Sequence, residues 1–83
     1  MPFFVFQGVD KPGMGKIRAH VREQHRTHLR LDHEGCRFVS GGPLVADDGE
    51  DMSGSLLIFE ADSREHVNRV LDSDPYKLAG MYI

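Results

Sequence analysis

Histidine is the side chain best suited to moving protons near neutral pH, and four of the five histidines fall within one stretch of this sequence. They are His20, His25, His28 and His33. His25 and His28 stand three positions apart, a spacing that allows two imidazoles on a helix to share one metal ion. The same stretch places no carboxylate as a third ligand, so we expect no metal site. For each histidine, packing or solvent exposure is the alternative to a chemical role.

An aspartate distant in the sequence is the second candidate group. Asp74 begins the motif Asp74-Pro75-Tyr76. In one interpretation Asp74 only accepts backbone N–H bonds in a turn that ends a helix. In the other it reaches a histidine of the first predicted helix, where it would fix the tautomer and increase the basicity of the ring. Such a pair is the smallest unit that can act as a general base. The spacing leaves both interpretations open.

The histidines are carried by a predicted helix that runs from Lys16 to about Glu34, where Gly35 provides a stop. Its apolar stripe is expected to contain Ile17, Val21, His28 and Leu31. His25 falls at the edge of that stripe, where a side chain can touch both a pocket and the packed interior. A second helix is predicted from the capping signature of Asp62 and Glu65, and it must end before Pro75.

Aromatic and β-branched segments predict four strands. They are Phe3–Gln7, Phe38–Val39, Ser55–Ala61 and Ala79–Ile83. Gly41-Gly42-Pro43 is expected to bend the chain at the end of the second strand or to bring backbone close to a small anion, and Asp47–Asp51 to form a polar hairpin tip. The order β-α-β-β-α-β predicts the α+β class: a ferredoxin-like antiparallel sheet with both helices on one face.

The strands are apolar on both faces, which indicates a second packing partner. Phe3 and Val5 face opposite to Phe4 and Phe6, and Leu56 and Ile58 face opposite to Leu57 and Phe59. Two helices cover only one face of a sheet, and a large exposed apolar patch usually marks an interface. We therefore expect a homodimer in which two sheets pack face to face. The alternative is that a loop or tail of the same chain covers the second face.

Composition narrows the class further. The length of 83 residues predicts a single domain that spans residues 1–83. The formal net charge of -3 disfavours nucleic acid or an anionic membrane as a partner. A lone cysteine, Cys36, excludes an internal disulfide and is expected to be structural. No apolar run is long enough to span a bilayer, and the first residues lack the pattern of a signal peptide, so we expect a cytoplasmic location.

Several short motifs, taken together and in order, resemble the YciI-like family over nearly the whole chain. They are Arg22-Glu23-Gln24-His25, Gly42-Pro43-Leu44, Asp48-Gly49-Glu50, Gly54-Ser55-Leu56-Leu57-Ile58, Asp74-Pro75-Tyr76 and Ala79-Gly80. The resemblance implies a dimeric α+β barrel of ferredoxin-like topology. It also implies a full last strand after Ala79-Gly80, of which this chain, ending at Ile83, is expected to show a very short version or to lack residues.

The resemblance further implies a catalytic pair, His25 and Asp74. The residues expected to bind substrate are Arg22, Gly42, Pro43, Ser55 and Tyr76. One branch of the family is similar to a dehydrochlorinase, which removes HCl from a chlorinated hydroxyhydroquinone and leaves a hydroxybenzoquinone. The leading hypothesis is therefore a lyase without metal, flavin or nicotinamide, acting on a small aromatic substrate. A non-catalytic binding or accessory protein and an isomerase of a related ring compound are the alternatives.

Overall fold

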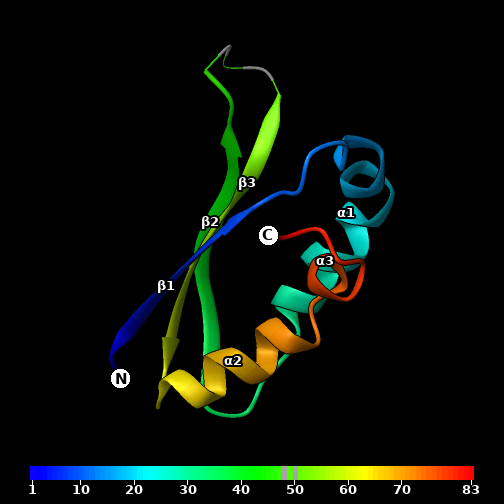
Figure 1. Ribbon diagram of the computed structural model, residues 1–83. Helices are drawn as coiled ribbons and strands as arrows, with labels where there is room; N and C mark the ends of the chain where they lie inside the picture. The colour runs from blue at the N-terminus through cyan, green and yellow to red at the C-terminus, as the bar shows by residue number, and fades with distance from the viewer. Residues whose placement is uncertain (48, 50) are drawn as a thin grey trace.

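The computed structural model describes residues 1–47, 49 and 51–83, so Asp48 and Glu50 of the expected hairpin tip lie outside the described residues. Its elements in chain order are β1 (Phe3–Val9), α1 (Gly15–Arg30), β2 (Cys36–Val45), β3 (Met52–Ala61), α2 (Arg64–Asp72) and α3 (Pro75–Leu78). Figure 1 shows the strands as one layer and the helices as a second layer on one side of it.

The described strands form an antiparallel sheet in the order β1-β3-β2. This order, with the helices on one face, confirms the predicted ferredoxin-like α+β fold. The core lies between the two layers, where Phe59 of the central strand is fully buried. Phe59 is opposite Phe4 on one neighbouring strand and opposite Phe38 on the other. From α2, Val67 and Val70 complete the same cluster.

Strand β2 is longer than predicted, because Gly41-Gly42-Pro43 continues the strand instead of ending it. A proline is tolerated here because β2 lies at the edge of the sheet, where its missing N–H leaves no partner unsatisfied. Gly41 allows a close approach, since a Cβ at this position would lie 2.4 Å from the backbone oxygen of Leu56. The predicted bend at this segment was wrong, and the register shifts of β2 lie on either side of it, between Phe38 and Ser40 and between Leu44 and Val45.

The first helix is shorter than predicted and presents a different face. It ends at Arg30, because Leu31 is already extended and Gly35 adopts its positive φ of 65° in the turn beyond. Its buried residues are Arg18, His25 and Leu29, whereas Ile17 and Leu31 of the predicted apolar stripe are exposed. Val21 and His28 of that stripe are half-buried, so the predicted stripe was only partly right, and the buried face is centred on more polar residues than predicted.

The second helix begins one residue later than its predicted signature. Ser63, and not Asp62, occupies the N-cap, and the Ser63 side chain accepts a hydrogen bond from the backbone N–H of His66. Both residues are good caps, so the sequence alone gave no means of choosing between them.

The predicted fourth strand is reduced to a single bridge between Tyr82 and Asp10, reinforced by a bond from the Ile83 N–H to the Val9 carbonyl oxygen. The unpredicted α3 occupies the preceding residues. The C-terminus thus lies beside β1, at the sheet edge where a fourth strand of this topology belongs (Figure 1). None of the helices in the described part of the chain has the length and apolarity that crossing a bilayer requires.

Candidate active site

The fold brings together His25 and Asp74, which are 49 residues apart in the sequence. His25 comes from the middle of α1, and Asp74 from the junction between α2 and α3. The Nδ1 atom of His25 lies 2.7 Å and 2.9 Å from the two carboxylate oxygens of Asp74. Both side chains are nearly inaccessible, at 8% and 1% exposure. The alternative in which Asp74 serves only a turn is therefore too narrow.

Asp74 also caps a helix, so its position is fixed twice. The backbone N–H of Tyr76 donates to Asp74 Oδ1 at 3.0 Å, and Pro75 follows as the first residue of α3. The Tyr76 ring then stacks on the His25 imidazole, with centroids 3.8 Å apart and planes inclined by 14°. The motif Asp74-Pro75-Tyr76 therefore holds the histidine ring both at its edge and across its face.

These contacts assign separate roles to the two ring nitrogens of His25. A neutral imidazole bears one proton, and the carboxylate beside Nδ1 places that proton there as a donor. The other nitrogen, Nε2, then carries the free lone pair. Within the described part of the chain no protein group is hydrogen-bonded to Nε2. His25 also lines a cavity of the protein. The arrangement of its side chain is therefore that of a base whose orienting partner is already in place.

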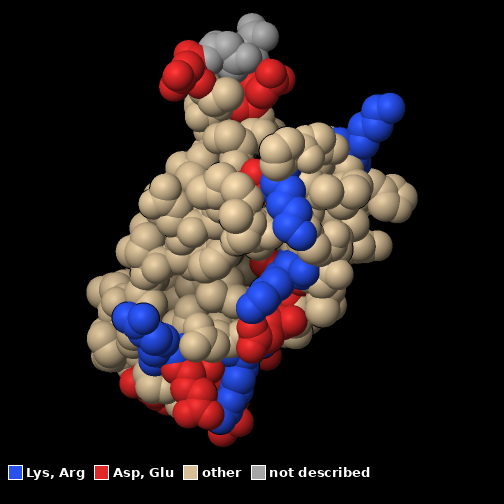
Figure 2. Space-filling model, in the orientation of Figure 1, with Lys and Arg blue, Asp and Glu red and all other residues tan. Residues whose placement is uncertain are grey.

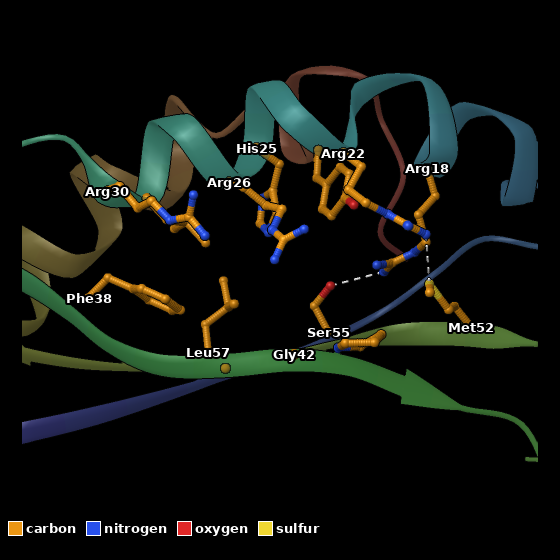
Figure 3. A pocket seen from close by; sticks show the side chains of 14 residues that line it. Arg18, Arg22, His25, Arg26, Arg30, Phe38, Gly42, Met52, Ser55 and Leu57 are labelled. Carbon is orange, nitrogen blue, oxygen red and sulfur yellow. Dashed lines mark hydrogen bonds between the residues drawn. The ribbon is translucent and has the colours of Figure 1, made fainter.

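A cavity of about 310 Å³ lies between α1 and the strands β2 and β3. Figure 3 shows the side chains of α1 descending into it from one side, toward the strands on the other. The described residues that line it are Arg18, Arg22, His25, Arg26, Leu29, Arg30, Phe38, Gly41, Gly42, Pro43, Met52, Ser55, Leu57 and Tyr76. Apolar side chains and arginines thus enclose a space suited to a small ring compound.

Ser55 supplies a hydroxyl at the floor of the cavity. Its oxygen accepts hydrogen bonds from Arg18 Nη2 at 2.9 Å and from the Tyr82 hydroxyl at 3.0 Å. These two bonds use both lone pairs of the oxygen, so the Ser55 proton remains to be donated. Burial raises the pKa of Tyr82 to about 12, so Tyr82 keeps its own proton and remains a donor. The Ser55 hydroxyl thus keeps a proton that these two bonds do not use.

Arg18 is a structural cation in the cavity wall. It forms a two-pronged ion pair with Asp10, with distances of 2.8 Å and 2.9 Å, and both side chains are buried. Its guanidinium carbon also lies 4.8 Å from the centroid of the Tyr76 ring. Burial lowers the pKa of Arg18, but the hydrogen bond and charge of Asp10 outweigh it and raise that pKa overall. Arg18 therefore stays charged and anchors Ser55 and Tyr76.

The structure places every expected substrate-binding residue around this one cavity. Arg22 lines it from α1, Gly42 and Pro43 from β2, Ser55 from β3 and Tyr76 from α3. Asp74 stands behind His25, outside the lining itself. Their roles toward a ligand remain predictions.

The remaining histidines of the first helix and turn point elsewhere. His28 Nε2 bonds the Val70 carbonyl oxygen at 2.8 Å, and His33 Nε2 the His28 carbonyl oxygen at 2.8 Å. His28 and His25 therefore do not face a common point. Among the described residues, no group of three or more possible ligand side chains is placed to hold a metal ion. Cys36 is buried, as expected of a structural cysteine, and burial raises its pKa.

Sequence reasoning missed three arginines of the cavity: Arg18, Arg26 and Arg30. A signal for them was present, because together with Arg22 they recur at every fourth residue, the spacing of neighbours on one side of a helix. Exposed charged residues at this spacing are common on helices, so the spacing alone does not distinguish a cavity wall from a solvated face.

The fold and cavity define an α+β protein of ferredoxin-like topology with a buried histidine–aspartate pair at a cavity wall. The YCII-related domain family matches residues 2–83, and the chain belongs to this family.

Known proteins similar to this chain agree with that assignment. Protein YciI of Escherichia coli O6:H1 and Protein YciI of Shigella flexneri are each 34% identical over an alignment of 84 residues, gaps included, and the match covers 95% of this chain and 86% of theirs. Among solved structures, 5-chloro-2-hydroxyhydroquinone dehydrochlorinase (TftG) from Burkholderia phenoliruptrix, in complex with 2,5-dihydroxybenzoquinone, is similar with a TM-score of 0.81. It shares 29% identity, and the match covers 98% of this chain and 85% of that chain.

Proposed function

We propose that this protein is a lyase that eliminates HCl from a chlorinated hydroxyhydroquinone, with His25 as the general base and Asp74 as its positioning partner. The observation that carries the proposal is the 2.7 Å contact between His25 Nδ1 and Asp74 at the wall of a cavity. That contact leaves Nε2 of His25 with a lone pair for a substrate proton. The named reaction of the similar structure, a dehydrochlorinase, supports this choice of chemistry.

The elimination balances without a redox cofactor. The reactive form of the ring is its keto tautomer. In this form the chlorine-bearing carbon is tetrahedral and is bonded to one end of a C=C double bond, and the carbon at the other end of that double bond bears a hydroxyl. His25 Nε2 takes the hydroxyl proton, the O–H electron pair forms the new C=O bond, and the double bond shifts toward the chlorine-bearing carbon. The C–Cl bond breaks, and chloride leaves with its electron pair. The products are a hydroxybenzoquinone, chloride and protonated His25, whose charge Asp74 balances.

Other cavity residues have roles consistent with this step. Ser55 donates to a ring oxygen, and the Tyr76 ring keeps the imidazole in plane for attack. Arg22 lies one helical turn from His25 and supplies positive charge near the oxygen that loses its proton. The strand segment Gly42-Pro43 forms part of the opposite wall of the cavity.

The direct test is to incubate the protein with 5-chloro-2-hydroxyhydroquinone under anaerobic conditions. Chloride is measured by ion chromatography and the quinone by its absorbance, each corrected for the reaction without protein. We expect the two products in equal amounts. A rearranged ring that retains chlorine would favour an isomerase, and a ligand recovered unchanged would favour a binding or accessory protein. Either result would contradict the lyase.

We also propose that the protein acts as a homodimer in the cytoplasm, with the helix-free faces of two sheets packed together. Phe3 and Val5 of β1 are 62% and 66% exposed on that face. On β3, Ile58 lies directly opposite Val5, and Leu56 follows on the same face. The described helices all cover the other side (Figure 1), so a second copy is the partner that matches this apolar surface.

Replacing Val5 by glutamate is expected to convert the dimer to a monomer, because the dimer would then bury a charge without a partner. Analytical ultracentrifugation should show the dissociation constant rising at least ~100-fold, the effect of losing about 3 kcal/mol of binding energy. Leu78→Glu is the matched control, since Leu78 is 73% exposed but lies on α3. A wild-type protein that sediments as a monomer, or equal effects of the two variants, would contradict the dimer.

A further inference from the structure

The α1 wall of the cavity carries concentrated positive charge. Arg18, Arg22, Arg26 and Arg30 follow one another at every fourth position, and Figure 3 shows their side chains directed from α1 toward the strands. Arg18 is already paired with Asp10, so the other three are named here the arginine row. The described lining of the cavity contains no aspartate or glutamate, although the whole chain has a net charge of -3.

The protein itself neutralises the arginine row poorly. Arg22 Nη2 donates to the sulfur of Met52 at 3.5 Å, which is a weak acceptor. The carboxylate of Glu23 is 3.8 Å from Arg26, and both side chains are largely exposed. In the described part of the chain, Arg30 makes neither an ion pair nor a hydrogen bond. These guanidinium groups are therefore available to an anion that enters the cavity.

The row runs along the mixed apolar and basic surface between the helices and the sheet. In Figure 2, basic side chains follow the boundary between the two layers and acidic side chains gather at the hairpin tip, whereas the opposite end of the molecule carries both. This arrangement would guide an anion toward the cavity and away from the hairpin tip.

We propose that the arginine row makes the cavity selective for a ring compound that binds as an anion, with its ionised ring oxygens facing α1. The inference rests on the proposed function, which places the substrate ring in this cavity. It adds that the substrate binds there as an anion. A planar guanidinium fork matches two oxygens, as on adjacent positions of an ionised hydroxylated ring. The row would also stabilise the negative charge that spreads onto ring oxygens when His25 removes a further proton.

The test compares three probes by isothermal titration calorimetry at low salt and neutral pH. 2,5-Dihydroxybenzoquinone is an acidic ring compound that is ionised at this pH, 2,5-dimethoxybenzoquinone is its neutral ether, and benzoate carries its charge on a carboxylate outside the ring. We expect the dihydroxyquinone to bind at least ~10-fold more tightly than either other probe, the advantage of charge-assisted hydrogen bonds. Added salt should reduce that advantage.

Variants locate the effect. Arg26→Gln should weaken binding of the dihydroxyquinone about three- to ten-fold, and Arg26→Gln with Arg30→Gln should weaken it further. The matched controls are Arg64→Gln and the double variant Arg64→Gln with Arg69→Gln, which change the net charge equally on α2, outside the cavity lining. The controls should bind as the wild type does. All four substituted residues are exposed, so folding is expected to survive.

Three results would overturn the inference. They are equal affinity for the charged and neutral quinones or no detectable binding of either, benzoate binding as tightly as the dihydroxyquinone, and row variants that behave like the α2 controls. Its failure is separable from that of the proposed function. Selective binding of the anion without chloride release would retain the inference and remove the lyase, whereas chloride release without selectivity for the anion would do the reverse.

Discussion

Replacing His25 by alanine is expected to lower chloride release at least ~100-fold, the low end of what a positioned general base contributes. Asp74→Asn is expected to cause a loss of the same order. Asparagine keeps an acceptor oxygen for the N–H of Tyr76 but cannot balance a charged imidazole, and its amide group can impose the wrong tautomer on His25. Steady-state chloride release and quinone absorbance, measured for each variant, give both losses.

The control for these variants is His20→Ala, on the same helix, because His20 is exposed and does not line the cavity. It should retain activity close to that of the wild type. Binding of 2,5-dihydroxybenzoquinone to the His25→Ala variant should persist, which would show that the fold and cavity are intact. Activity within a few-fold of the wild type for either His25→Ala or Asp74→Asn would remove the general-base role.

Removal of Asp10 is expected to produce the largest loss of stability. Asp10→Ala leaves the buried guanidinium of Arg18 without its carboxylate, and breaking a buried ion pair in this way costs about 3–5 kcal/mol of unfolding free energy. Chemical denaturation followed by circular dichroism measures the loss. Because Arg18 also donates to Ser55, the affinity of the cavity for ring compounds should fall in parallel at temperatures where the variant remains folded.

Glu65→Ala is the matched control for Asp10→Ala. Glu65 also pairs with an arginine, Arg69, at 2.9 Å, but both side chains are exposed on α2. Such a surface pair is worth about 0.5 kcal/mol or less. Equal losses of stability in the two variants would show that burial of the Arg18 ion pair has no special weight.

The topology could be predicted because it depends on local and strongly patterned residues. The aromatic and β-branched segments defined the strands, and the distribution of turn residues gave their order. Pairing His25 with Asp74 required the family resemblance, since a separation of 49 positions leaves their distance undetermined by spacing alone.

The buried face of α1 could not be predicted, because the sequence signal for burial is apolarity. Arg18 is 4% exposed, yet it belongs inside only when Asp10 and Ser55 satisfy its donors. Ser55 lies on β3 and Asp10 directly follows β1, so no short window of sequence around Arg18 contains both partners. The same limit hid α3: four residues that begin with a proline are too few to show a helical period, and the Asp74 cap is their main local signal.

A consequence follows from the double use of Asp74. A single carboxylate holds the first turn of α3 and aligns the imidazole, so fraying of this short helix would release the base at the same moment. A helix of four residues has few hydrogen bonds of its own, and such short segments open easily in native proteins. The temperature at which the site loses its geometry therefore depends on how Met81, Tyr82 and Ile83 pack against the rest of the protein, as well as on the stability of the sheet. Any ligand that packs on Tyr76 would stabilise α3, and it would protect α3 and the residues that follow it from hydrogen exchange and proteolysis.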